Sequence, residues 1–233
     1  MRKPDPNQAM VERLALQLGD LRLRVVFLGG AATGLLLTDP GAPSIRITKD
    51  VDVIVQIGSR REYRTLEKEL MDLGFSPDPT EGAPLCRWTF EGLLIDIMPT
   101  DPKLLGFSNR WYPGALLDAI EYTLPNGTQI RLVSPPYFLA TKLEAFLGRG
   151  KGDFMGSHDL EDVMSVLDGR TSVLDEVAAS APELRRFIAQ TFLGFLENEG
   201  FIGSIQGNLP PDPASQSRFP ALLGRIRKLS GLP

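Results

Sequence analysis

Two aspartates, Asp50 and Asp52, stand on either side of a single valine, and the residues that follow are almost all apolar. This pattern predicts a strand over 51–56. Side chains two residues apart on a strand point to the same face, so the two carboxylates converge. Like charges this close repel unless a cation neutralises them, and carboxylate oxygens suit Mg²⁺ or Mn²⁺. The spacing therefore predicts a metal site, and the alternative is a strand end that exposes two acids to water.

A glycine pair precedes these acids by about twenty residues. Gly29 and Gly30 follow a strand expected at 23–28 and precede a short buried helix expected at 31–38. Backbone N–H groups at such a turn, together with the N-terminus of the helix, can receive a phosphate, and Thr33 would help them. A phosphate site beside a metal site is the pairing that a metal-bound phosphate ester requires.

A third acid, Asp96, lies within the apolar run Leu93 to Met98. An unpaired buried carboxylate is costly, so Asp96 needs a cation, a basic partner or water at the edge of the sheet. The run forms the second strand of a hairpin whose first strand is expected at 87–90. Asp101 is a weaker candidate for the same role because it follows Pro99 in a loop.

The composition limits the chemistry that is available. Cys86 is the single cysteine and His158 the single histidine, so a metal must be held mainly by oxygen. A net charge of −4 and a pI near 5.2 argue against a surface that binds nucleic acid non-specifically, although local basic patches remain compatible with them. No apolar stretch is long enough to span a bilayer and the first residues lack a signal core, so we expect a cytoplasmic protein without membrane contact.

The remaining patterns predict an α/β half up to residue 133 and a helical half at 134–233. A second hairpin is expected at 119–124 and 128–133, across Pro125-Asn126-Gly127. Residues 209–216 contain three prolines and read as a loop. Helices are expected at 7–19, 59–74, 137–147, 158–167, 172–179, 183–198 and 219–229.

The helical half contains a second group of charged residues, which includes Lys142, Asp159 and Asp162. Asp159 falls in the first turn of its helix, where a negative charge opposes the helix dipole. Asp162 lies three residues further along the same face and can pair with a base. His158, at the start of this helix, is expected to be a capping or surface residue.

The glycine pair followed by Asp-x-Asp resembles the polymerase β-like nucleotidyltransferase superfamily. Three further stretches are similar to its AbiEii/MenT-type branch, which includes toxins of toxin–antitoxin and phage-defence systems. These stretches are Arg-x-Thr-Lys-Asp-x-Asp, then Ser-Pro-x-Tyr-x-Leu-Ala-x-Lys-Leu-x-Ala-Phe, and a following Arg with Asp-x-x-Asp. The resemblance covers roughly residues 25–168. Many superfamily members have a serine where this chain has Gly30. In this chain, backbone N–H groups would therefore have to bind the phosphate without a serine hydroxyl.

The resemblance implies a mixed sheet flanked by helices in domain 1–133, and a helical domain at 134–233 that covers a nucleotide cleft. It implies metal-dependent transfer of a nucleoside monophosphate from a triphosphate to an acceptor hydroxyl. The implied metal ligands, for Mg²⁺ or Mn²⁺, are Asp50, Asp52 and Asp96. The implied nucleotide-binding residues are Gly29, Gly30, Thr33, Lys142, Asp159 and Asp162, with Lys142 also counted as catalytic.

The acceptor and the partners stay open at this point. The family suggests RNA, particularly tRNA 3′ ends, or a protein hydroxyl, and a cognate antitoxin as partner. A small-molecule adenylyltransferase of the aminoglycoside-modifying kind has the same acid pair. An inactive nucleotidyltransferase fold that serves as a binding module is the non-enzymatic alternative, and it would be favoured if Asp96 pointed away from Asp50 and Asp52.

Overall fold

The structure is a computed structural model that describes residues 5–106 and 108–232. The chain forms two compact units. The first, here called the sheet unit, consists of residues 6–32 and 47–134. The second, here called the helical unit, contains residues 33–46 and the chain from residue 135 onward, together with Asp5. Each unit is described by itself.

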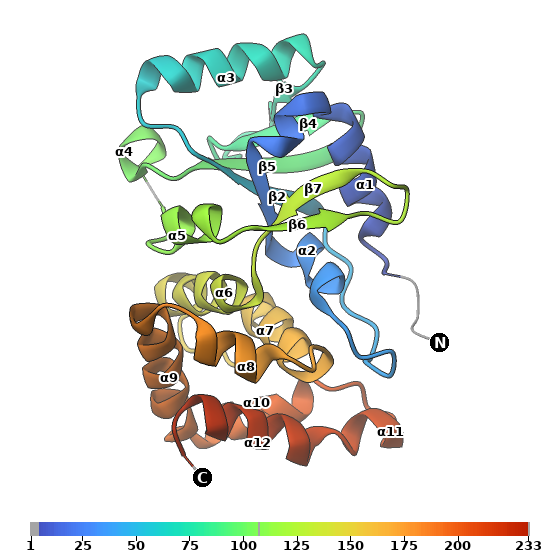
Figure 1. The fold of residues 1–233 in the computed structure, drawn as a ribbon, viewed down its shortest axis with the longest axis vertical. Coiled ribbons are helices and arrows are strands. Elements are labelled where there is room, and N and C mark those ends of the chain that lie inside the picture. The colour runs from blue at the N-terminus through green and yellow to red at the C-terminus, as the bar shows by residue number, and fades with distance from the viewer. Residues whose placement is uncertain (1–4, 107, 233) are drawn as a thin grey trace. The chain divides into compact units, whose positions relative to one another are not determined.

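The sheet unit is built on a seven-stranded mixed sheet with the strand order β3-β4-β5-β2-β1-β7-β6 (Figure 1). The pairs β2–β5 and β1–β7 are parallel, and the other neighbours are antiparallel. The mixed α/β class expected from the sequence is therefore confirmed. The strands are β1 (Val25–Leu28), β2 (Asp50–Val55), β3 (Ser76–Pro77), β4 (Arg87–Phe90), β5 (Leu93–Pro99), β6 (Ile120–Thr123) and β7 (Gln129–Leu132).

The apolar runs of the sequence form the centre of this sheet. All four residues of β1 are buried, and so are the last three of β2. Strands covered on both faces are expected to be continuously apolar, as these are. The polar residues of β2, Asp50 and Asp52, are the exceptions at its N-terminal end, and both remain partly exposed.

Helices surround the strands of the sheet unit (Figure 1). The hydroxyl of Ser59 accepts a hydrogen bond from the Glu62 N–H at 3.2 Å and caps α3, as expected. The first strand begins two residues later than expected because a 3₁₀ helix, η1, precedes it. The helices are α1 (Gln8–Gln17), η1 (Gly19–Leu23), α3 (Arg60–Asp72), α4 (Pro102–Leu105) and α5 (Tyr112–Leu117). The helix α2 (Gly29–Leu36) begins directly at the glycine pair and continues into the helical unit.

The helical unit is organised around α6, whose apolar side chains are largely buried and which packs against α7, α8 and α9. Phenylalanine rings from several segments pack edge to face beside it, with Phe146 and Phe195 at 5.4 Å between ring centroids. Its helices are α6 (Pro135–Arg149), α7 (His158–Gly169), α8 (Val173–Ala179), α9 (Pro182–Leu196), α10 (Glu199–Gly207), α11 (Pro213–Gln216) and α12 (Phe219–Leu229).

The prediction of a loop over 209–216 is wrong for its second half, because α11 occupies 213–216. Asp212 caps this helix by accepting a hydrogen bond from the Ser215 N–H at 3.0 Å, and Pro213 is its first residue. Asp followed by Pro is typical of a helix start, but the three prolines at 209–216 led to the prediction of a loop. None of the helices in the described part of the chain combines the length and apolar character needed to cross a bilayer.

Candidate active site

Three strands bring a row of charged side chains to one level of the sheet. Asp52 of β2 lies opposite Asp96 of β5, and Asp96 lies opposite Arg87 of β4. Directly opposed residues on neighbouring strands present their side chains to the same face. Asp50, two residues before Asp52, shares that face. Asp50 and Asp52 therefore share one face of the sheet, as expected from their spacing, and Asp96 lies on the same face.

Arg87 connects two of these acids. Its Nε and Nη2 atoms donate hydrogen bonds of 2.8 and 2.7 Å to the two carboxylate oxygens of Asp96. The same Nη2 atom donates to Oδ2 of Asp50 at 3.0 Å. Fork-shaped pairing of this kind is the strongest arrangement between a guanidinium and a carboxylate. The hydrogen bonds to Asp96 raise the pKa of Arg87 above its ordinary value, and the charges of Asp96 and Asp50 add to this effect.

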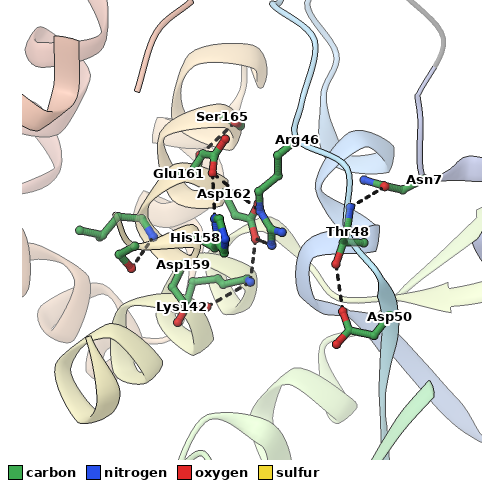
Figure 2. Close-up of polar contacts among 12 residues, drawn as sticks. Asn7, Arg46, Thr48, Asp50, Lys142, His158, Asp159, Glu161, Asp162 and Ser165 are labelled. Carbon is green, nitrogen blue, oxygen red and sulfur yellow. Dashed lines mark hydrogen bonds and ion pairs between the residues drawn. The ribbon is translucent and has the colours of Figure 1, made fainter. Parts of the chain in front are cut away.

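Asp50 is held from its other side as well. The hydroxyl of Thr48 donates to Oδ1 of Asp50 at 2.9 Å, and the Thr48 N–H donates to the side-chain oxygen of Asn7 at 3.0 Å (Figure 2). Asn7 lies directly before α1, so the N-terminal helix positions the residue that orients Asp50. Each carboxylate oxygen of Asp50 therefore accepts a hydrogen bond from a different segment of the sheet unit.

Gly29, the first residue of the glycine pair, lies against Asp52. Leu28, the last residue of β1, is opposite Asp52, and Gly29 follows it with a φ of 71°. A Cβ atom built on Gly29 would overlap the Asp52 carboxylate. Position 29 therefore requires glycine for two reasons, the positive φ and the closeness of the carboxylate. The Gly-Gly and Asp-x-Asp stretches, separate in the sequence, meet at this point.

The other expected residues of the glycine turn are enclosed. Gly30 is the second residue of α2 and is buried. Thr33 has no exposed surface, and its hydroxyl finds no hydrogen-bond partner within the described residues.

Asp101, the weaker candidate for the third acid, instead caps α4 by accepting a hydrogen bond from the Lys103 N–H at 2.9 Å.

A second charged cluster lies within the helical unit (Figure 2). The Lys142 ammonium group of α6 contacts Oδ2 of Asp162 at 2.7 Å and Oδ1 of Asp159 at 3.2 Å, both on α7. Arg46 pairs with Asp162 through two hydrogen bonds of 2.9 and 2.8 Å, and Arg149 pairs with Asp159 at 2.9 Å. The structure thus brings together the lysine and both acids that the sequence singled out, and each acid contacts two cations.

Burial makes these pairs electrostatically strong. Lys142 is 8% exposed, Asp159 7% and Asp162 1%. Burial alone raises the pKa of Asp162, but the positive charges of Lys142 and Arg46 outweigh it, so that this pKa lies below its ordinary value. Burial likewise opposes the charge on Arg46, but its hydrogen bonds and attraction to Asp162 leave its pKa raised.

A small cavity of about 260 Å³ lies in the helical unit next to this cluster. Arg46, Glu161 and Ser165 supply part of its polar lining, and Leu37 and Met164 part of its apolar lining. Drug-sized ligands occupy pockets of about 300–1,000 Å³, so this cavity suits a smaller group than a whole nucleotide. His158 is largely exposed and contacts Glu161 at 3.2 Å, in agreement with the surface role expected for it.

Two arginines were not identified from the sequence: Arg87, which pairs with Asp96 and Asp50, and Arg46, which pairs with Asp162. Arg87 could have been found, because a two-residue turn at Glu91-Gly92 sets a register in which position 87 pairs with position 96. Arg46 gave only a weak signal. It belongs to the motif that ends in Asp50-Val51-Asp52, but its partner Asp162 is 116 residues away in the chain.

The acids in this arrangement do not match a metal site of three carboxylates. Within residues 5–106 and 108–232, no three carboxylate, imidazole or thiol side chains are grouped so as to hold a metal ion. Oxygens of Asp50 and Asp96 that would serve as ligands accept hydrogen bonds from Arg87 instead. Of the three solutions open for Asp96, namely a cation, a basic partner or water, the structure contains the basic partner.

Comparison with known proteins gives similar solved structures, including two of nucleotidyltransferase-like proteins. One is an antigenic nucleotidyltransferase-like protein from Paracoccidioides brasiliensis, with 20% identity and a TM-score of 0.49, covering 88% of this chain and 94% of that one. The other is a candidate nucleotidyltransferase from H. pylori, with 10% identity and a TM-score of 0.47, covering 98% of this chain and 96% of that one. No protein-family profile and no curated protein matches the chain.

Proposed function

We propose that the protein is a nucleotidyltransferase that moves a nucleoside monophosphate from a triphosphate to an acceptor hydroxyl. The observation that carries this proposal is the meeting of Gly29 with the Asp52 carboxylate, beside Asp50 and Asp96. A backbone turn at a helix N-terminus favours phosphate, and neighbouring carboxylates favour the cation that accompanies a triphosphate. Asp96 and Asp50 accept hydrogen bonds from the same guanidinium, so Asp96 does not point away from Asp50 as it would in the inactive binding module expected as the alternative.

The chain's own groups have distinct parts in this proposal. Gly29 leaves room for the Asp52 carboxylate, while Thr48 and Asn7 keep Asp50 in place. In the helical unit, we propose that the ammonium group of Lys142 contacts phosphate oxygens, and that Asp159 and Asp162 hold it extended. Binding of Mg²⁺ or Mn²⁺ at Asp50, Asp52 and Asp96 belongs to the proposal, and requires Arg87 to release the oxygens that it now contacts.

A basic face on α3 favours a polyanionic acceptor. Arg60, Arg61, Arg64 and Lys68 line a shallow hollow along this helix, and none of the four side chains makes an ion pair with another described residue. Two acids of the same helix are occupied elsewhere, since Glu62 accepts a hydrogen bond from the Gly58 N–H and Glu69 pairs with Arg24. Unpaired cations along a helix attract phosphate groups and repel a cationic drug.

The acceptor that this face fits is RNA, which includes the tRNA 3′ ends suggested by the AbiEii/MenT-type motifs. A role as the toxin of a toxin–antitoxin or phage-defence system, with a cognate antitoxin as partner, rests on those motifs alone. A protein hydroxyl and an aminoglycoside are the competing acceptors, and the experiment below separates them.

The proposal is tested by incubating the protein with each labelled nucleoside triphosphate, Mg²⁺ and one acceptor class at a time: total tRNA, protein or aminoglycosides. We expect label in the RNA with wild-type protein, and a loss of at least about 100-fold in D50N and D52N. D101N is the matched control, because it removes the same charge from an acid that only caps a helix. Label in a protein or a drug would replace RNA as the acceptor. Absence of both transfer and triphosphate binding with wild-type protein would refute the function.

A further inference from the structure

Arg46 and Lys142 share one carboxylate oxygen in the helical unit (Figure 2). Oδ2 of Asp162 lies 2.8 Å from Nη2 of Arg46 and 2.7 Å from Nζ of Lys142. The Nε atom of Arg46 donates to the other oxygen, Oδ1, at 2.9 Å. Because a fork-shaped contact fixes the plane of a carboxylate, Arg46 determines where Asp162 presents Oδ2 to the lysine.

The opposite side of Lys142 is held less firmly. Its contact with Oδ1 of Asp159 is longer, at 3.2 Å, and Arg149, the second partner of Asp159, has a side chain that is 73% exposed. The side chains of Arg46 and Asp162 are only 18% and 2% exposed. Water and salt screen buried charges less than exposed ones, so the contact with Asp162 dominates the position of the ammonium group.

The backbone that carries Arg46 is fixed within the same unit. The N–H groups of Thr38 and Asp39 donate to the carbonyl oxygen of Gly169, the last residue of α7, at 2.9 and 2.8 Å. Asp162 lies on this same helix. Arg46 therefore reaches its acid from a stretch of chain that is anchored to the helix carrying that acid.

The charges of the cluster around Lys142 do not balance. The cluster consists of three cations and two carboxylates: Arg46, Lys142, Arg149, Asp159 and Asp162. Glu161 lies 4.0 Å from Nε of Arg46, and its side chain is 35% exposed, so water weakens its contribution. Without Arg46, the two carboxylates would neutralise the two remaining cations, and Lys142 would have no surplus charge to offer a phosphate.

We infer that Arg46 is a positioning residue for Lys142. Its guanidinium fixes the Asp162 carboxylate and takes up its charge, so that the Lys142 ammonium is held in one position and keeps positive charge for the phosphates of a triphosphate. This inference rests on the proposed function for the role of Lys142, but its effect on phosphate binding can be measured without nucleotide transfer.

A purely structural role for Arg46 makes a different prediction. If Arg46 only fastens residues 33–46 to α7, its removal lowers stability and leaves the phosphate affinity of the folded protein unchanged. Arg170 offers the comparison, because it follows α7, donates to the Leu36 carbonyl at 2.7 Å and pairs with Glu176. Its side chain is 15% exposed, close to the 18% of Arg46. R170A is therefore the matched control for the loss of a fastening arginine.

The cavity of about 260 Å³ beside Arg46 makes a chemical rescue feasible. Arg46 is part of its lining, and so are the exposed residues Ser44 and Pro211, so solvent can reach it. Truncation of Arg46 to alanine adds the volume of the lost side chain to this cavity. An ethylguanidinium ion fits the combined space and can form the same two-pronged contact with Asp162 that the side chain formed.

The test measures binding of inorganic triphosphate to the full chain by isothermal titration calorimetry, with urea unfolding of every variant. We expect R46A to bind at least about tenfold more weakly than wild type, because a charge-assisted contact that supports Lys142 is lost. R170A should bind as wild type does. Ethylguanidinium should tighten binding to R46A at least about threefold and leave wild type and K142M unchanged. Tetramethylammonium, which cannot donate a hydrogen bond, should not rescue R46A.

Two further variants decide the matter if R46A does not fold. R46K keeps the charge and should retain most of the affinity, whereas R46Q should bind as weakly as is expected of R46A. Equal affinities of R46K and R46Q, equal affinities of folded R46A and R170A, or R46A that ethylguanidinium does not rescue would each overturn the positioning role. Positioning fails alone if K142M weakens triphosphate binding and R46A does not, whereas the function fails if wild type neither transfers nucleotide nor binds triphosphate.

Discussion

The Asp52 carboxylate occupies the space into which a side chain at Gly29 would extend. Strand pairing enforces this relationship, because Asp52 is opposite Leu28, the residue just before Gly29. The glycine turn and the acid pair are therefore one structural unit, and a change on either side must affect the other.

G29A should lower the free energy of unfolding and abolish nucleotide transfer. An L-residue at a φ of 71° costs about 1–2 kcal/mol, and the collision with Asp52 adds about 1–3 kcal/mol. G82A is the matched control, because Gly82 has a φ of 79° and nothing within 4 Å of a built Cβ. Urea unfolding of both variants isolates the collision. Equal losses in G29A and G82A would show that Asp52 does not limit position 29.

Local patterns predicted much of this arrangement, but only where the partners are close in sequence or on one strand. The convergence of Asp50 and Asp52 follows from the period of a strand, and the α3 cap follows from Ser59. Arg87 is predictable in the same way, because a two-residue turn at Glu91-Gly92 places position 87 opposite position 96.

Long-range pairs could not be derived in this way. Arg46 contacts Asp162 across 116 residues, and no periodicity reports which acid a distant arginine will meet. Short helices were missed for another reason. The helix α11 has four residues, fewer than periodicity can detect, and only the Asp212-Pro213 start marks it.

D162N should destabilise the protein near neutral pH by about 3–5 kcal/mol, because it leaves the buried Lys142 and the half-buried Arg46 without their shared acid. The pKa of Asp162 is lower in the folded protein than its ordinary value of 3.8. Its stabilising effect is thus complete above the unfolded-state pKa and disappears as the pH falls through the folded-state pKa.

Urea unfolding at several pH values, from neutral to below 3.8, checks this expectation. Wild type should lose stability more steeply than D162N over the acidic part of the range, so that the two curves approach one another. D175N, which removes an exposed carboxylate of the same unit, should follow wild type. Parallel curves for wild type and D162N would contradict the role given to Asp162.

K142M should reduce nucleotide transfer by about 10²–10³-fold, since it removes one positive charge proposed to contact the phosphates. The loss should appear mainly in kcat if the contact strengthens in the transition state. Thermal unfolding must accompany the kinetics, because Asp159 and Asp162 lose a buried partner. K228M is the matched control, because it removes an exposed lysine of the same unit. A folded K142M with wild-type kcat/KM would remove Lys142 from the proposal.

The triple variant R60Q/R64Q/K68Q should weaken RNA binding and reduce its dependence on salt. Each phosphate contact contributes about 0.7 to the slope of log affinity against log salt for a single strand, so loss of three contacts lowers the slope by about 2. R186Q/R227Q/K228Q is the matched control, because it removes three exposed charges from the helical unit. Fluorescence anisotropy with labelled tRNA over a salt series measures both slopes. An equal fall of the salt slope in the two variants would indicate general charge attraction and not a binding face on α3. If wild type binds anionic vesicles more tightly than it binds tRNA, the α3 face is a membrane-binding surface instead.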